Sequence, residues 1–211
     1  MTTSVNTNPI FTKSGSINTG KTILAANTAK DGTGTVVTVF DPQRAVASIT
    51  SSGTTATVTT SDVHGFLNGE EILHNGAGEA GYNGIVTITV TGPKSYTYTV
   101  AAGLATPATG TITADPINGT RIEKLVWQPL GTNVDSAGRA FLNNGQSNTT
   151  ATNNIYLDDV TLAASTLSEV ASMAGTEMPL DIVVPPFHKI NVTLGTAVAA
   201  GYAVYAVAGS Y

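Results

Sequence analysis

Apolar and polar residues alternate along most of the chain with a period of two, unlike the wider spacing of an amphipathic helix. Because successive side chains of a strand point to opposite faces, this alternation predicts half-buried strands. Threonine and valine dominate these segments, and branching at Cβ favours a pleated strand. The pattern predicts strands at residues 35–40, 55–59, 85–90, 96–100, 109–113, 120–127, 137–142, 155–162, 182–184 and 189–194.

Turn-forming pairs separate the predicted strands, among them Asn68-Gly69, Asn83-Gly84, Asn118-Gly119 and Asn144-Gly145. Many short strands punctuated in this way are typical of a sandwich or barrel, whereas βαβ proteins need long helices between strands. We therefore predict an all-β protein whose main domain is a β-sandwich, with a jelly roll as one candidate arrangement.

One short helix is predicted near the end of this pattern. Thr166 and Glu169 have the spacing of a capping box, and Leu167 and Val170 would share one face of a helix that ends before Gly175. The helix would have about two turns and would plug one end of the sandwich.

The segment from Arg44 to Ala114 begins and ends with a predicted strand and contains hairpin signals of its own. Its removal would join Phe40 to the strand that starts near Thr120 through a short turn. We therefore predict a parent domain of residues 1–43 and 115–211 with a small β domain, residues 44–114, inserted into a loop. Residues 1–14 form an N-terminal arm, which either frays or lies on a neighbouring subunit through Ile10 and Phe11.

Composition narrows the possible functions. The chain has 211 residues, no cysteine and a formal net charge of −5, and only 11% of its residues are charged, against about 25% in ordinary globular proteins. A disulfide framework and a cysteine zinc site are excluded. The negative charge argues against nucleic-acid binding, which needs a basic stripe. No apolar run is long enough for a membrane helix, and no secretory signal is expected.

The segment from Gly15 to Thr22 matches the letters of a nucleotide-binding P-loop, with Lys21 and Thr22 at its end. Such a loop must follow a buried strand and open a helix whose N-terminal amides hold the phosphates. Neither neighbour fits this requirement, and we expect no nucleotide site.

The remaining polar groups also favour structural roles. His64, Glu70, Glu71 and His74 could be drawn as a metal site, but nothing in the pattern brings His64 to the others. The adjacent carboxylates Asp158 and Asp159 would point to opposite faces of a strand, so they cannot share a proton. The turn of residues 143–148 is rich in asparagine and has no carboxylate, which favours a surface turn over a calcium or sugar site. We predict no catalytic residue, cofactor or metal, and no enzyme.

Three aromatic residues are candidates for contact between subunits. Trp127, the only tryptophan, is expected in the core, with an interface anchor as the alternative. The C-terminal run places Tyr202 on one face of a strand and Tyr205 on the other. A strand that is apolar on both faces is either central in the sandwich or covered by another subunit.

Several short segments of the sequence, called phrases here, resemble tailed-phage virion proteins, specifically small β-rich head proteins of the decoration, or cement, type. The phrases are residues 18–24, 31–40, 119–125, 139–145 and 167–170. A second set resembles an Ig-like module that occurs in phage structural proteins: residues 56–60, 64–65, 76–77, 82–84 and 96–98. Residues 65–71 depart from the usual turn of that module.

The resemblance implies a protein that binds the outside of an assembled capsid, contacts the major capsid protein, often forms a homo-trimer, and stabilises the shell. The Ig-like insert would project outward. The alternative is a tail, fibre or collar protein whose insert adheres to glycans on the host surface.

Overall fold

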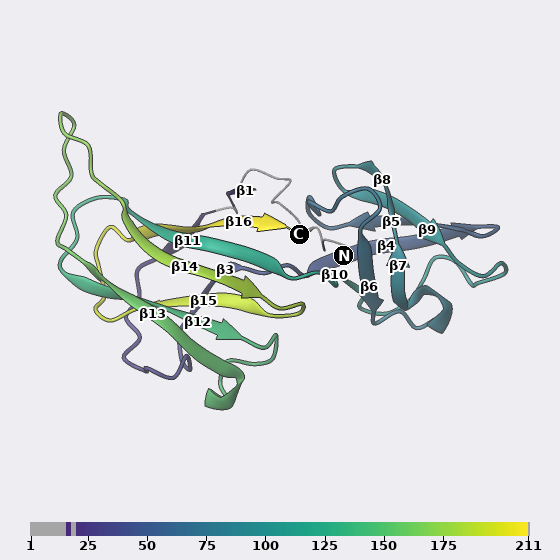
Figure 1. Ribbon diagram of the computed structural model, residues 1–211, viewed down its shortest axis with the longest axis horizontal. Helices are drawn as coiled ribbons and strands as arrows, with labels where there is room; N and C mark the ends of the chain where they lie inside the picture. The colour runs from purple at the N-terminus through teal and green to yellow at the C-terminus, as the bar shows by residue number, and fades with distance from the viewer. Residues whose placement is uncertain (1–15, 18–19, 211) are drawn as a thin grey trace, which may run out of the picture. The chain divides into compact units, whose positions relative to one another are not determined.

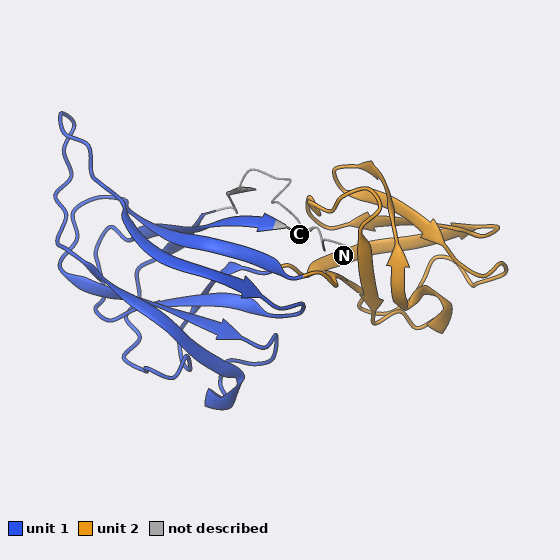
Figure 2. Cartoon of the chain, in the orientation of Figure 1, with its two compact units in different colours: residues 1–41, 119–211 blue, residues 42–118 orange. Residues whose placement is uncertain are grey.

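The computed structural model describes residues 16–17 and 20–210 (Figure 1). The chain forms two compact units, coloured separately in Figure 2. One consists of residues 1–41 and 119–211 and is called the sandwich unit here; the other, Pro42–Asn118, is called the inserted unit. The insert predicted at residues 44–114 lies within the second unit.

The sandwich unit consists of two antiparallel sheets, and the prediction of an all-β sandwich is confirmed. In one sheet, β16 (Tyr202–Ser210) pairs with β11 (Thr120–Pro129), which pairs with β14 (Thr176–Val184); the other edge of β16 pairs with β1 (Ser16–Ile17) and β2 (Lys21–Ile23). The second sheet has the order β13 (Asn154–Leu162), β12 (Ser136–Asn143), β15 (Lys189–Leu194) and β3 (Val37–Phe40).

The order of the strands is that of a jelly roll. Counted along the chain from β2 within this unit, the sheets read 1-8-3-6 and 5-4-7-2, which is the eight-stranded double-sheet arrangement of jelly rolls. Because each strand crosses the sandwich, successive connections alternate between its ends. The connections at residues 130–135, 163–175 and 195–201 and the start of the 24–36 connection therefore gather at one end, which we call the loop end (Figure 1). The connection from β3 to β11, which holds the insert, leaves at the other end.

The core of the sandwich unit lies between the sheets and is centred on Trp127, which is fully buried. Gly138 on β12 faces this ring across the core, and a Cβ atom at Gly138 would lie 2.8 Å from it. Glycine is thus required there so that the two sheets can approach each other around the indole.

The predicted helix at residues 166–174 is wrong, because this segment is an extended loop between β13 and β14. Leu167 and Val170 are exposed, so an apolar helix face would have nothing to pack against, and packing supplies most of a short helix's stability. The Ser168 hydroxyl instead accepts hydrogen bonds from the amides of Val170 and Ala171, a local turn that competes with a helix. The only helical elements in the described part of the chain are 3₁₀ turns at Ala80–Tyr82 and Ala151–Asn153, and none has the length or apolar character needed to cross a bilayer.

The inserted unit is one seven-stranded antiparallel sheet whose two edges meet. Its order is β7 (Gly84–Thr87), β6 (Glu71–Asn75), β10 (Thr113–Pro116), β4 (Arg44–Ser52), β5 (Thr55–Thr60), β9 (Ser95–Thr99) and β8 (Thr89–Gly92). The edge strands β7 and β8 are separated only by Ile88, which is buried and exchanges backbone hydrogen bonds with Gly69 and Glu70. The sheet is therefore barrel-like and nearly closed, with its own apolar core. Ile88 also divides the single strand predicted at residues 85–90.

His74 lies in the core of the inserted unit against two tyrosines. Its ring stacks parallel to Tyr96, with ring centroids 5.7 Å apart, and lies 4.7 Å from Tyr98. Nε2 is 2.7 Å from the Tyr96 hydroxyl, whereas Nδ1 has no hydrogen-bond partner within the described residues. Burial lowers the pKa of His74 from 6.5 to about 4, because the charged imidazolium is poorly solvated there.

The stability of the inserted unit is expected to depend on His74 in mild acid. A depressed pKa means that the unfolded chain binds the proton first, so the free energy of unfolding is at its full value above pH 6.5 and falls as the pH decreases toward 4. The loss reaches about 3 kcal/mol, at about 1.4 kcal/mol per pKa unit. Hydrogen exchange of peptides from residues 42–118, corrected for intrinsic rates, should reveal this loss. His74→Gln should flatten the pH dependence, and His188→Gln, in the sandwich unit, should leave it unchanged. An equal pH dependence in wild type and His74→Gln would contradict the account.

Candidate functional site

The loop end of the sandwich is held together by one buried asparagine. Asn133 lies in the connection between β11 and β12 and is 4% exposed. Its Oδ1 accepts hydrogen bonds from the amides of Ala200 and Gly201 at 2.9 and 3.0 Å, and its Nδ2 donates to the Gly201 carbonyl at 3.0 Å. Its backbone amide and carbonyl both pair with those of Ser165, each at 2.9 Å. Asn133 thus links three connections that are far apart in the sequence.

Further hydrogen bonds reinforce this arrangement. The Ser165 hydroxyl donates to the Gly131 carbonyl at 2.7 Å, and Asp135 Oδ1 accepts from the Ala164 amide at 2.7 Å. The Leu167 amide donates to the Thr132 hydroxyl at 3.0 Å. These bonds fix the base of the 163–175 loop against the 130–135 connection, so the loop end is an ordered surface.

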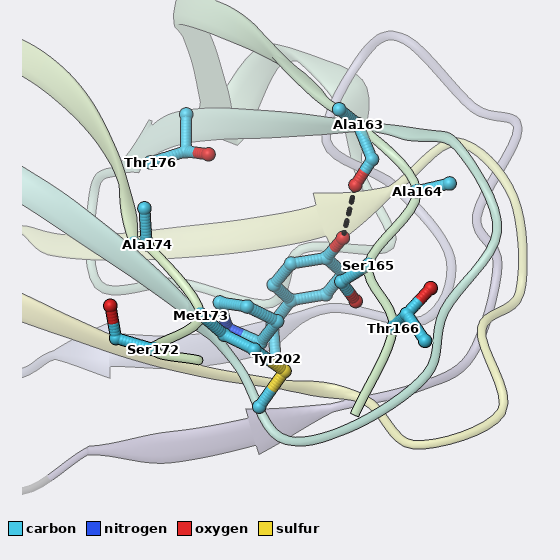
Figure 3. A pocket seen from close by; sticks show the side chains of 11 residues that line it. Ala163, Ala164, Ser165, Thr166, Ser172, Met173, Ala174, Thr176 and Tyr202 are labelled. Atoms are coloured by element: carbon cyan, nitrogen blue, oxygen red, sulfur yellow. Dashed lines mark hydrogen bonds between the residues drawn. The ribbon is translucent and has the colours of Figure 1, made fainter. Parts of the chain in front are cut away.

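A pocket of about 390 Å³ lies at the base of the same loop (Figure 3). Tyr202 forms its inner wall and donates a long hydrogen bond, 3.4 Å, to the Ala163 carbonyl. The lining is of small hydroxyl and apolar side chains without a charged group: Pro129, Ala163, Ala164, Ser165, Thr166, Ser172, Met173, Ala174, Gly175, Thr176 and Tyr202. Such a lining offers no acid, base or nucleophile–base pair for catalysis, and it suits contact with neutral groups.

The structure separates the aromatic residues considered as subunit contacts. Trp127 and Tyr202 are buried within the sandwich and expose 0% and 2% of their surface. Tyr205 is half-buried on the opposite face of β16, where it pairs with Val126 of β11. Ile10 and Phe11 lie outside the described residues. Tyr205 is therefore the described member of the set with surface available to a neighbour.

The segment that resembles a P-loop has a strand where a helix is required. Lys21 and Thr22 lie in β2 and pair with Val204 and Ala203 of β16. Gly15 and residues 18–19 lie outside the described residues. Strand amides are used for pairing with the neighbouring strand, so the observed geometry of Lys21 and Thr22 differs from a phosphate-binding helix start.

The histidines and glutamates of the inserted unit have separate structural partners. His64 Nδ1 accepts from the Phe66 amide at 2.9 Å, so Nε2 carries the proton and donates to the Gly92 carbonyl at 3.0 Å. Glu70 accepts from the Leu67 amide, and His74 contacts Tyr96 as described. Within the part of the chain that the structure describes, no three histidine or carboxylate side chains come together as a metal site would require.

The asparagines of the 143–148 turn bond to Asn153, Asn154 and the backbone. Asn143 Nδ2 donates to Asn154 Oδ1 at 2.8 Å, and Asn144 Nδ2 donates to Asn153 Oδ1 at 3.1 Å. Asn148 Nδ2 donates to the carbonyl of Gly34 at 2.8 Å. These amides stabilise the turn and join it to the 24–36 connection. On the neighbouring strand β13, Asp158 and Asp159 are both exposed and lie beside a register shift against β12.

Sequence reasoning missed Asn133 and the loop end. Asn133 follows Gly131 and Thr132 and looks like an ordinary turn residue. Its role depends on Ser165 and on a connection more than 60 residues away along the chain, and a local sequence pattern cannot predict such contacts. No protein-family model, curated protein or solved structure matches the chain.

Replacing Asn133 by alanine is expected to loosen the loop end and destabilise the sandwich unit. The substitution leaves the amides of Ala200 and Gly201 without their partner and removes one of the two hydrogen bonds to the Gly201 carbonyl, at a cost of about 3 kcal/mol. Urea unfolding followed by the fluorescence of Trp127, the only tryptophan, measures this unit directly. Asn118→Ala, at an exposed asparagine, is the matched control. Equal unfolding midpoints for the two variants would refute the role of Asn133.

Proposed function

We propose that this chain is a phage virion structural protein that binds the outside of an assembled capsid and stabilises it, as a decoration protein does. The proposal rests on the positions of the two sets of phage-like phrases in the fold. The first set covers or overlaps β2, β3, β11 and β12 of the jelly roll, and its last phrase lies in the 163–175 loop. The Ig-like phrases all fall in the inserted unit. Each resemblance thus coincides with one compact unit.

The architecture is compatible with this role. Jelly rolls occur in viral capsid domains and in lectins, although a fold alone does not determine a function. A loop end that is fixed by internal hydrogen bonds presents a preorganised surface, and preorganisation reduces the entropy lost on binding. Contact of this kind requires no reactive group.

Stabilisation of a shell follows from mass action. A protein that binds only the assembled shell lowers the free energy of that state by about 2.7 kcal/mol per site when its free concentration is 100 times the Kd. When many sites are occupied, these contributions add up and raise the resistance of the whole shell to disruption. The partner in this proposal is the major capsid protein, and the location is the outer surface of the virion.

The proposal includes a homo-trimer, for which Tyr205 on the outer face of β16, together with Ile10 and Phe11, supplies candidate contacts. The alternative is a tail, fibre or collar protein whose insert binds host glycans. The separate core of the inserted unit supports this alternative, because a unit with its own core can carry its own binding activity.

The full chain is expected to co-sediment with empty shells assembled without it, and to raise their disruption temperature in calorimetry. A variant in which Asp41 is joined to Gly119 removes the inserted unit and should bind shells with unchanged affinity. Trp127 fluorescence verifies that the sandwich unit of this variant is folded. Failure of the full chain to bind shells at micromolar concentration would refute the decoration function. Binding of host-surface glycans by the full chain but not by the folded deletion variant, without binding to shells, would favour the adhesin.

A further inference from the structure

Exposed apolar side chains gather at the loop end of the sandwich. They come from three of the four connections that meet there: Leu24 (43% exposed), Leu130 (46%), Val134 (57%), Leu167 (55%) and Val170 (98%). We call these five residues the apolar end. Single exposed apolar residues are ordinary, but several at one end of a domain are typical of a protein contact surface.

The connections that meet at the loop end carry a net negative charge. The 24–36 connection contains Lys30 and Asp31, whereas the other three connections contain two acidic residues, Asp135 and Glu169, and no lysine or arginine. Both acidic residues are exposed. The loop end therefore combines exposed apolar side chains with a weak net negative charge.

This charge pattern indicates which partner fits. Two copies of the chain that met through this end would bring two surfaces of net negative charge together, which disfavours association. A partner with an apolar patch and lysine or arginine beside it would bury the five side chains and pair with both carboxylates. The occupant is accordingly a different protein.

We propose that the apolar end is the surface by which the protein docks onto the capsid shell, against an apolar, basic-rimmed patch of the major capsid protein. This inference rests on the proposed decoration function and specifies its contact. The 163–175 loop, fixed at its base by Asn133 and Ser165, supplies Leu167 and Val170 as the protruding contacts. The chain leaves the sandwich unit for the inserted unit at the opposite end, at Asp41 and Gly119. Docking through the loop end would therefore leave these two linking segments exposed.

The test compares shell binding by variants of the full chain. Leu167→Asp combined with Val170→Asp should weaken binding to empty shells by at least roughly tenfold, because two contact residues become charged. Glu169→Lys should also weaken binding, and wild-type binding should weaken as salt increases. Ile155→Asp is the matched control, since Ile155 is 59% exposed on β13 and lies outside the four connections of the loop end. Trp127 fluorescence verifies folding of each variant.

The outcomes separate this inference from the proposed function. Wild-type binding together with equal binding by the Leu167/Val170 double variant and Ile155→Asp would overturn the apolar end as the contact and leave the decoration function standing. Absence of wild-type binding would overturn both. Sedimentation velocity tests whether a second copy of the chain occupies this end instead. Self-association of the wild type that is lost in the double variant would show that it does, and the inference would then be wrong.

Discussion

Successive strands of the sandwich unit run in opposite directions between its two ends, and this constraint decides where every connection lies. The β3–β11 connection, the turn of residues 144–153 and the β14–β15 connection share one end. The other four connections begin or lie at the loop end, and the 24–36 connection continues from there to the turn of residues 144–153. An insertion in the first of these connections therefore leaves the four other connections unchanged in the sequence and in their strand order. The same alternation lets Asn133 reach Ser165 and Gly201, although they are far from it in the sequence.

Hydrogen bonds of uncharged side chains shape the connections of the sandwich unit. Asn27 Nδ2 donates to the carbonyls of Thr33 and Thr35, and its Oδ1 accepts from Ala29, so one amide shapes the 24–36 connection. Asn133 does the same for the loop end. The Lys124–Glu177 pair lies on an exposed face and raises the pKa of Lys124, but exposed pairs contribute little to stability. The low charge content of the chain is thus compatible with an ordered surface.

The sequence predicted elements wherever local pattern decides them. The period of two located most strands, because burial of one face imposes that period directly: β5, β12, β13 and β15 lie within one residue of the predicted ranges. It found only the last three residues of β14, in which Pro179 and a left-handed backbone at Asp181 interrupt the alternation. The helix at 166–174 failed because a capping box cannot indicate whether an apolar face has anything to pack on. Asn133 and the apolar end were invisible for a related reason, since both arise from segments that meet only in the folded chain.

The central claim is that the sandwich unit contacts a capsid shell through its loop end. Hydrogen exchange of the full chain, free and bound to empty shells, tests it most directly, because the exchange of each segment is measured without altering any residue. The account predicts that binding slows exchange in residues 130–135 and 163–175 and leaves residues 42–118 unchanged. Protection confined to residues 42–118, or to the outer face of β16 around Tyr205, would contradict it.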